Sequence, residues 1–382
     1  MANANLSSAK TAKNDEFYTQ YNDIEAEINA YIEFNSDVFR GKTVLLPCDD
    51  PEWSNFTRYF ASNFERFGIK KLISTSYAKG AGNKQLTLFE EKSPLYDAEK
   101  HETRGKLFTL THDTDGSGNI DTDDIEFLGY LEGDGDFRSD EVCKLRDEAD
   151  IVVTNPPFSL FREFLSWIMD AKKQFIIIGN QNAITYKEVF PLLMENLIWL
   201  GNNEGGSRKG NSMFFIVPND YDNRFVEQVD GKRLMQTTGK WFTNIDHGKR
   251  HEILRLDTMA HNLKFNKKLR KKFENDYGKL EYPHYDNYDA IEVPITESIP
   301  SDYEGLMGVP VTFLDRYNPE QFEILGITDR NNPFGLTTKI YTADDIPNYG
   351  DCNRRGAIKM ADGTIRSTYA RLLIRPKKGG NS

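Results

Sequence analysis

The chain has 382 residues, enough for two ordinary domains, and its 25 Phe, 18 Tyr and 4 Trp exclude a disordered protein. Its three cysteines exclude a disulfide scaffold and a four-cysteine zinc site, and no apolar run approaches the roughly 18 residues that span a bilayer. The first residues lack the apolar stretch of a secretory signal. We therefore expect a cytoplasmic protein.

Charge is distributed unevenly along the chain. The formal net charge is −11, which taken alone argues against a polyanion as partner. However, residues 205–280 hold 16 basic and 9 acidic residues, and residues 353–382 hold 8 and 1, whereas residues 1–150 hold 17 and 30. The two basic segments are suited to a phosphate backbone, although solvated helix faces explain the same charge equally well.

Short apolar runs alternate with amphipathic segments over the first 218 residues. Strands are predicted over residues 42–48, 71–76, 150–154, 174–179, 197–200 and 213–218, with further strands around an acidic turn within 106–132. Helices are predicted over residues 15–34, 52–67, 160–171 and 186–195, and a loop over 79–105. The alternation predicts an α/β fold with a doubly wound, mainly parallel sheet, in which ligands bind beyond the carboxyl ends of the strands. After Pro218 the sequence no longer shows this alternation of strands and helices.

One tetrapeptide, Asn155-Pro156-Pro157-Phe158, follows a predicted buried strand directly. Pro156 forces Asn155 toward extended geometry, and the two prolines remove two backbone donors. The resulting corner is rich in acceptors, with a flat aromatic ring beside it. Such a corner can hold both hydrogens of a planar amino group by positioning and electrostatics, without a strong base. A simple tight turn is the alternative for a tetrapeptide seen without its context.

Several longer blocks accompany this corner in a fixed order. They are Asp15-Glu-Phe-Tyr-Thr-Gln20, Cys48-Asp-Asp-Pro51, Gly133-Asp-Gly-Asp-Phe-Arg-Ser139, the strand and corner over 150–161, Ile184-Thr-Tyr-Lys-Glu-Val-Phe190, Trp241-Phe-Thr-Asn-Ile245, Tyr285-Asp-Asn-Tyr-Asp-Ala-Ile291 and Met307-Gly-Val-Pro-Val-Thr-Phe313. Together they resemble the EcoRI-type adenine-N6 DNA methyltransferases from about residue 14 to 325. The resemblance implies a Rossmann-like, S-adenosylmethionine-dependent methyltransferase fold with a C-terminal target-recognition region.

The resemblance also assigns roles to particular residues. The catalytic positions are Asn155, Pro156, Pro157 and Phe158. The positions that bind S-adenosylmethionine are Phe17, Tyr18, Thr19, Asp49, Asp50, Pro51, Asp136 and Phe137. For the three aspartates, helix capping or turn formation is the alternative. The usual glycine-rich loop after the first strand is absent.

The family resemblance further implies a division of the chain and a set of partners. Residues 1–13 form a flexible N-terminus, residues 14–218 the catalytic domain, and residues 219–382 the DNA target-recognition region with its basic C-terminal segment. Candidate DNA contacts are Arg208, Lys209, Lys249, Arg250 and His251. The implied partners are double-stranded DNA and a cognate restriction endonuclease acting on the same site; a monomer suffices, and no membrane is involved.

Other functions remain open at this stage. Corners of this kind also serve methyltransferases that act on RNA guanine N2 or on protein glutamine, and a DNA-binding module that has lost catalysis is a third alternative. The two basic segments favour DNA, and the intact tetrapeptide argues against loss of activity.

A separate signal lies in Asp113-Thr-Asp-Gly-Ser-Gly-Asn-Ile-Asp-Thr-Asp-Asp124, which follows the EF-hand calcium-loop pattern. Ligands would come from Asp113, Asp115, Ser117, Asn119, Asp121 and Asp124. The twelfth position is Asp rather than Glu, and the flanks are predicted strands rather than helices. We therefore expect an acidic turn without a metal.

Overall fold

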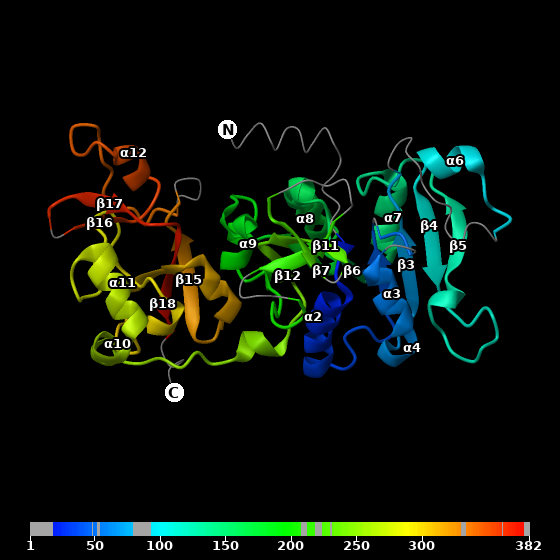
Figure 1. Ribbon diagram of the computed structural model, residues 1–382, viewed down its shortest axis with the longest axis horizontal. Helices are drawn as coiled ribbons and strands as arrows, with labels where there is room; N and C mark the ends of the chain where they lie inside the picture. The colour runs from blue at the N-terminus through cyan, green and yellow to red at the C-terminus, as the bar shows by residue number, and fades with distance from the viewer. Residues whose placement is uncertain are drawn as a thin grey trace. The chain divides into compact units, whose positions relative to one another are not determined.

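The computed structural model describes residues 18–47, 49–51, 54–78, 93–207, 212–217, 224–229, 231–329, 334–360 and 362–377. The predicted flexible terminus, residues 1–13, lies outside them. The chain divides into two compact units (Figure 1). Unit 1 comprises residues 1–181 and 200–247, and unit 2 comprises residues 182–199 and 248–382. No described helix has the length and apolar character that crossing a membrane requires.

Unit 1 is built on a sheet with the strand order β5-β4-β3-β2-β6-β7-β12-β8. Its strands are β2 (Thr43–Leu46), β3 (Lys71–Thr75), β4 (Lys106–Leu110), β5 (Glu126–Tyr130), β6 (Ile151–Thr154), β7 (Gln174–Asn180), β8 (Trp199–Leu200) and β12 (Gly239–Thr243). The four central strands, β3, β2, β6 and β7, are mutually parallel, whereas β4, β5 and β12 pair antiparallel. The prediction of an α/β fold with a central parallel sheet is confirmed.

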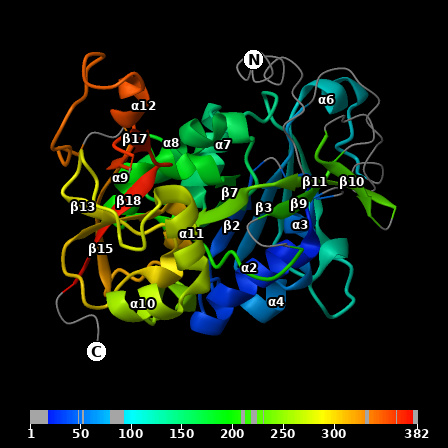
Figure 2. The ribbon, with the colours of Figure 1, turned by 60° about the vertical axis from the view of Figure 1, so that its left-hand side comes forward.

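Helices cover both faces of this sheet (Figure 2). They are α2 (Tyr21–Phe34), α3 (Asn55–Ser62), α4 (Phe64–Phe67), α6 (Ala98–Thr103), α7 (Asp140–Glu148) and α8 (Phe161–Asp170), with 3-10 turns at Thr122–Asp124 and Phe158–Leu160. A further 3-10 turn, Gln181–Thr185, begins at the last residue of this part of unit 1 and continues into unit 2. The apolar faces of α2 and α3 pack on β2, β3 and β6 to form one core cluster. Every residue of β2 and β6 is buried, as expected for central parallel strands.

A second, smaller sheet in unit 1 has the order β1-β9-β11-β10. Its strands are β1 (Tyr18–Thr19), β9 (Met213–Ile216), β10 (Val226–Val229) and β11 (Lys232–Thr237). Its pairings are antiparallel. The strand predicted over residues 213–218 therefore belongs to this small sheet and not to the parallel one.

Three element boundaries differ from the predictions for identifiable reasons. The first helix begins at Tyr21 rather than near residue 15, because Tyr18 and Thr19 pair with β9. The helix predicted over 52–67 is split at Asn63, and its first part begins after Ser54, whose hydroxyl caps two backbone N–H groups. The loop predicted over 79–105 contains α6, of which Asp97 is the N-cap.

Unit 2 contains a four-stranded sheet with the order β13-β14-β18-β15 and a two-stranded ribbon. The strands are β13 (Ala290–Glu292), β14 (Leu306–Pro310), β15 (Phe322–Ile327) and β18 (Arg371–Pro376), and the ribbon is β16 (Ala357–Lys359) with β17 (Ile365–Ser367). The helices are α9 (Phe190–Met194), α10 (Met259–Phe265), α11 (Lys267–Tyr277) and α12 (Tyr349–Cys352), with 3-10 turns at Gly248–His251, Thr296–Ser298 and Val311–Arg316. The helix predicted over 186–195 is thus confined to α9.

The regular structure does not stop at residue 218. Strand β12 lies well beyond it and pairs with β7 in the central sheet, from Gly239 opposite Asn180 to Thr243 opposite Ile176. Unit 1 therefore extends to His247. The assignment of residues 219–382 to target recognition stays a prediction.

Candidate active site

Residues predicted to bind or react follow two neighbouring parallel strands. Asp49 comes after β2 and Asn155 after β6, and Ser76, which has no predicted role, follows the next strand, β3; the three strands are adjacent in the order β3-β2-β6. Since the strands are parallel, their carboxyl ends meet at the same edge of the sheet. The first strand-to-helix turn and the Asn-Pro-Pro-Phe corner thus lie side by side.

A hydrogen-bonded network joins these two turns directly. The Thr154 hydroxyl, at the end of β6, donates to Oδ2 of Asp49 at 2.7 Å and lies 2.9 Å from the Pro47 carbonyl oxygen. The other carboxylate oxygen of Asp49 accepts from the Ser54 hydroxyl at 2.7 Å. Asp49 is only 9% exposed, so these bonds fix a buried carboxylate beside the Asn-Pro-Pro-Phe corner.

Asp50 lies in the same turn and faces a buried cation. The Lys106 ammonium is 3.9 Å from Oδ2 of Asp50, and the Lys106 side chain is only 5% exposed. The Ser76 N–H donates to the Lys106 carbonyl oxygen at 3.0 Å, and the Lys106 N–H donates to the Ser76 hydroxyl at 3.2 Å, so the start of β4 is held against the end of β3. Pro51 is buried in this turn. The second predicted aspartate therefore lies beside a buried lysine at the start of β4.

The loop over residues 133–137 packs closely on the end of β3. Gly135 has φ +87°, and a Cβ added there would lie 2.3 Å from the Ser76 carbonyl oxygen, so only glycine fits. The Ala78 N–H donates to the Asp134 carbonyl at 2.7 Å. This places the third predicted cofactor motif at the same sheet edge as Asp49.

Within that loop, the two predicted cofactor residues have partners of their own. Asp136 accepts from Nε and Nη2 of Arg138 at 2.9 and 2.6 Å, and this bidentate bond lowers the pKa of the Asp136 carboxyl. Phe137 is buried between the rings of Phe164 and Trp167. Burial in this aromatic cluster favours a packing role for Phe137, and its contact with a cofactor stays untested.

The N-terminal motif reaches the site through strand β1. Tyr18 and Thr19 pair with Ile216 and Phe215 of β9, and the Asn55 amide donates to the Thr19 carbonyl at 2.7 Å. The Thr19 hydroxyl is buried and makes no hydrogen bond to any described residue. The first residue of the predicted motif, Phe17, lies outside the described residues.

The Asn-Pro-Pro-Phe corner itself is anchored on one side by an aromatic contact. Asn155 is half-buried and Pro156 buried, and Phe158 opens the short turn that leads into α8. The Phe158 ring meets the Phe215 ring edge to face, with centroids 6.1 Å apart. Because Phe215 is the strand partner of Thr19, one element links the predicted cofactor motif with the predicted catalytic ring.

Two carboxylates on α2 hold the loop over residues 201–207. Oε1 of Glu27 accepts from the Asn202 N–H at 2.7 Å, and Oε2 accepts from the Asn203 N–H at 2.9 Å. One turn earlier on α2, Asp23 accepts from the N–H and the hydroxyl of Ser207, both at 2.6 Å. The segment that leads to the candidate DNA contacts Arg208 and Lys209 is therefore held against α2. Arg208 and Lys209 themselves lie outside the described residues.

The other candidate DNA contacts form a 3-10 turn in unit 2. Arg250 is buried: its guanidinium carbon lies 3.7 Å from the centre of the Trp199 ring, and Nη2 donates to the Asn196 side chain. These contacts favour a structural role for Arg250. Lys249 is half-buried and His251 exposed, and their contact with DNA stays a prediction.

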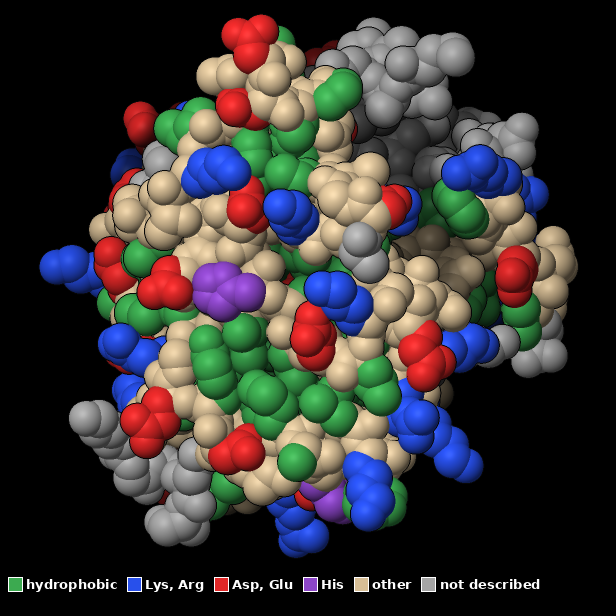
Figure 3. All heavy atoms as spheres, turned by 90° about the vertical axis from the view of Figure 1, so that its left-hand side faces the viewer, with side chains coloured by type: hydrophobic (Ala, Val, Ile, Leu, Met, Phe, Trp, Pro, Cys, Tyr) green, Lys and Arg blue, Asp and Glu red, His purple; other side chains and the backbone are tan. Residues whose placement is uncertain are grey.

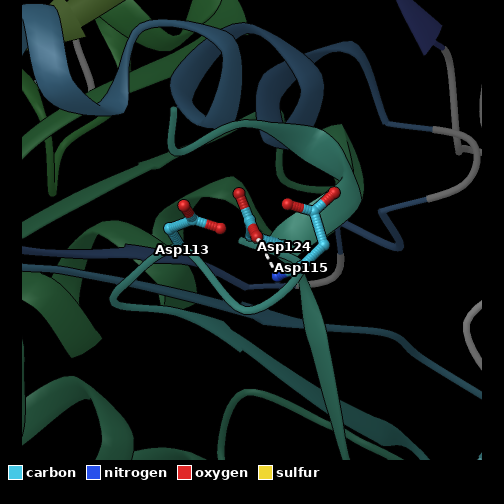
Figure 4. A group of neighbouring side chains, drawn as sticks. All are labelled: Asp113, Asp115 and Asp124. Carbon is cyan, nitrogen blue, oxygen red and sulfur yellow. Dashed lines mark hydrogen bonds between the residues drawn. The ribbon is translucent and has the colours of Figure 1, made fainter. Parts of the chain in front are cut away.

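The acidic turn brings three carboxylates together, from Asp113, Asp115 and Asp124, within 4.8 Å of one another (Figure 4). Asp124 is buried and accepts from the N–H groups of Thr114, Asp115 and Asp121. Asp113 accepts from the Gly118 and Gly116 N–H groups, which lower its pKa.

The rest of this turn is held in the same way. Asp121 caps the 3-10 turn, and Ser117 bonds to Asn119. The flanking elements are β4 and β5, as predicted, and not helices. The carboxylates of Asp113 and Asp124 therefore already accept hydrogen bonds from backbone N–H groups of the turn.

Several residues of the site are not predicted from the sequence. Thr154 and Ser54 donate hydrogen bonds to Asp49 and have no predicted role. Thr154 directly precedes the motif residue Asn155, and Ser54 follows the motif residue Pro51 by three positions. The sequence does not predict that Lys106 is buried, because a lysine at the start of a strand is usually exposed. Phe215 is one apolar residue among several in its strand, and nothing local distinguishes it.

The family model described as "Adenine-specific methyltransferase EcoRI" matches residues 5–377. The chain belongs to this family. It is 45% identical over 325 residues to the Type II methyltransferase M.EcoRI of Escherichia coli, covering 84% of this chain and 88% of M.EcoRI.

Two mycoplasma proteins match over a greater length. M.MpnI of Mycoplasma pneumoniae is 32% identical over 376 residues, with 97% of both chains covered. M.MgeORF184P of Mycoplasma genitalium is 32% identical over 379 residues, with 97% of this chain and 98% of that protein covered. No solved structure matches the chain. The predicted family is confirmed, and the chain is an adenine-specific methyltransferase.

Proposed function

We propose that this chain transfers a methyl group from S-adenosylmethionine to N6 of an adenine flipped out of duplex DNA. The observation that carries the proposal is the hydrogen bond from Thr154 to Asp49, because it joins the Asn-Pro-Pro-Phe corner to the turn suited to the methyl donor. M.EcoRI and M.MpnI are named Type II methyltransferases, which supports DNA as the substrate.

The described residues fit S-adenosylmethionine. The carboxylates of Asp49 and Asp50, at the carboxyl end of β2, are complementary to its ammonium group. The buried Thr19 hydroxyl, which makes no hydrogen bond to a described residue, would gain a partner. When bound, S-adenosylmethionine supplies an electrophilic methyl group on a positively charged sulfur.

The corner after β6 would hold the amino group of the target base. Pro156 and Pro157 have no N–H, so the Asn155 side-chain oxygen and the Pro156 carbonyl oxygen can accept the two N6 hydrogens. The ring of Phe158 would stack on the base, which must leave the duplex to reach this corner. Asn155 is neutral, so it orients N6 and does not remove a proton before transfer. The surplus proton leaves N6 afterwards.

The wider setting follows from the same proposal. Unit 2 would recognise the target sequence, with its basic residues on backbone phosphates and a few side chains on bases. Only one base is flipped at a time, so a monomer suffices. We expect the protein to act in the cytoplasm, beside a restriction endonuclease with the same target site.

The proposal is tested with labelled S-adenosylmethionine and unmethylated genomic DNA, followed by digestion and identification of the labelled base. All label should appear as N6-methyladenine. Asn155→Ala should lower the transfer rate by about 10²–10³-fold or more and leave the Kd for S-adenosylmethionine unchanged. Asn35→Ala, an exposed asparagine at the end of α2, is the matched control and should act as wild type.

Two results would contradict this function. Label in protein or RNA and none in adenine would replace DNA with another substrate. Loss of S-adenosylmethionine binding in Asn155→Ala, together with loss of transfer, would assign Asn155 a structural role. Sequencing that detects methylated adenines would then identify the target site.

A further inference from the structure

Unit 2 contains a cavity of about 320 Å³ between the end of α11 and the ribbon strand β16. Its apolar lining includes Tyr277, the last residue of α11, and Ile358 and Met360 from the ribbon. A β-bridge between Tyr285 and Ile358 keeps the two walls together. A volume of this size is in the range of pockets that take a small ligand, about 300–1,000 Å³.

The walls are held by a buried ionic network. Glu292 is fully buried and accepts from Nε and Nη2 of Arg371 at 3.0 and 2.7 Å. The same carboxylate accepts from the Tyr277 hydroxyl at 3.1 Å and from the Tyr285 hydroxyl. Tyr277 therefore cannot swing into the cavity without leaving part of a buried charge unsatisfied, so the cavity is formed before any ligand arrives.

The charged part of the lining has two lysines and one acid. These are Lys279, Lys359 and Glu281, and His284 lies beside them. Lys279 and Glu281 are both exposed and 3.4 Å apart, so their mutual attraction is weak. Lys359 is exposed and forms no salt bridge with a described residue. His284 binds the Tyr285 carbonyl through Nδ1, and Nε2 lies 3.4 Å from the exposed Asp289.

The chain segment that contains the ribbon, residues 353–382, is also basic. Residues 353–382 hold eight basic residues and one acid. Arg355, Arg371 and Arg375 pair with carboxylates inside unit 2, which leaves Lys359 and Arg366 of the ribbon without a salt bridge to a described residue. Figure 3 shows a face on which exposed apolar side chains gather in one area with charged side chains around it.

We propose that this cavity binds one sugar–phosphate unit of the backbone of the DNA substrate. The deoxyribose would pack on Tyr277, Ile358 and Met360, and the phosphate would meet the ammonium groups of Lys279 and Lys359. The inference rests on the proposed DNA methyltransferase function and adds a place in unit 2 where the DNA backbone would be held. Because backbone contacts carry no sequence information, the site sets affinity and register and does not select the target.

The test compares Lys279→Ala, Lys359→Ala and the double variant with the wild type in binding to a labelled duplex at several salt concentrations. The slope of log Kd against log salt should fall by about 0.9 for each phosphate that the variant no longer neutralises. Cognate and unrelated duplexes should weaken by the same factor, and the Kd for S-adenosylmethionine should not change. Lys70→Ala is the matched control: Lys70 is exposed just before β3, at the opposite end of the parallel strands from the active site.

Each other outcome has a definite meaning. A wild-type slope in the double variant, with a wild-type melting temperature, overturns the inference. Weakening confined to the cognate duplex overturns it as well, because it assigns the lysines to base recognition. If inorganic phosphate shifts the melting temperature of the wild type and not of the double variant, while DNA binding is equal in both, the cavity serves a small phosphate instead. If the wild type does not methylate adenine at all, the proposed function fails separately.

Discussion

Glu27 provides the sharpest test of how unit 1 is held together. Its side chain is 1% exposed, and Oε1 accepts from the Tyr31 hydroxyl and the Asn202 N–H, while Oε2 accepts from the Asn203 N–H. In Glu27→Gln, the amide oxygen can replace Oε1, and the NH₂ group then faces the Asn203 N–H. A charge-assisted bond is replaced by two opposed donors.

The size of the effect follows from those contacts. Loss of a hydrogen bond to a charged group costs about 1.5–3 kcal/mol, and a buried donor without an acceptor costs about 1–3 kcal/mol. We expect a loss of about 3 kcal/mol in the free energy of unfolding. In a protein unit of this size each kcal/mol lowers Tm by about 2–4 °C, so Tm should fall by about 6–12 °C.

The assay is thermal unfolding of the full chain at neutral pH. Glu25→Gln is the matched control, since Glu25 is on the same helix and exposed, and it should change Tm by no more than about 1 °C. Equal Tm values for the Glu27 and Glu25 variants would refute the reasoning, because they would mean that the 201–207 loop does not depend on the buried carboxylate.

Three further outcomes are expected. Thr154→Val keeps the side-chain shape and removes the donor to Asp49. The Kd for S-adenosylmethionine, measured by isothermal titration, should therefore rise about tenfold, equivalent to about 1.4 kcal/mol. An unchanged Kd would mean that the Asp49 carboxylate does not contribute to cofactor binding. The lowered pKa of Asp136 means that its pairing with Arg138 stabilises the fold at neutral pH and is lost as the pH falls below the usual aspartate range, so Asp136→Asn should reduce the acid sensitivity of Tm. Calcium at millimolar concentration should leave Tm unchanged within about 1 °C, and a clear rise would show that the 113–124 turn binds the ion.

The central strands and the sheet edge at which they end can be predicted from the sequence for a simple reason. Strands β2 and β6 are buried on both faces, so they appear as continuous apolar runs, and the polar residues Asp49 and Asn155 mark where each run ends. Parallel pairing then brings the two ends to one edge. Local pattern and topology therefore predict that Asp49 and Asn155 lie close together, whereas the roles of the two residues come from the family resemblance.

Other parts depend on partners that no local pattern reveals. Strand β12 contains a glycine and a lysine, yet all five of its residues are buried, because it pairs with β7 some sixty residues earlier in the chain. Arg250 stands in a basic triplet typical of a phosphate contact, but Trp199 and Asn196 cover its guanidinium. Burial of Lys106 likewise depends on tertiary packing beside Asp50.

The path of the chain between the two units has a consequence for engineering. The chain leaves unit 1 after Gln181, returns at Leu200 and leaves again after His247. A single cut therefore yields neither unit whole: a fragment ending at residue 218 lacks β12 and keeps residues 182–199 without the rest of unit 2. Exchanging unit 2 between relatives would require two coordinated replacements, residues 182–199 and 248–382. A fusion at one junction would unite parts of two incomplete cores.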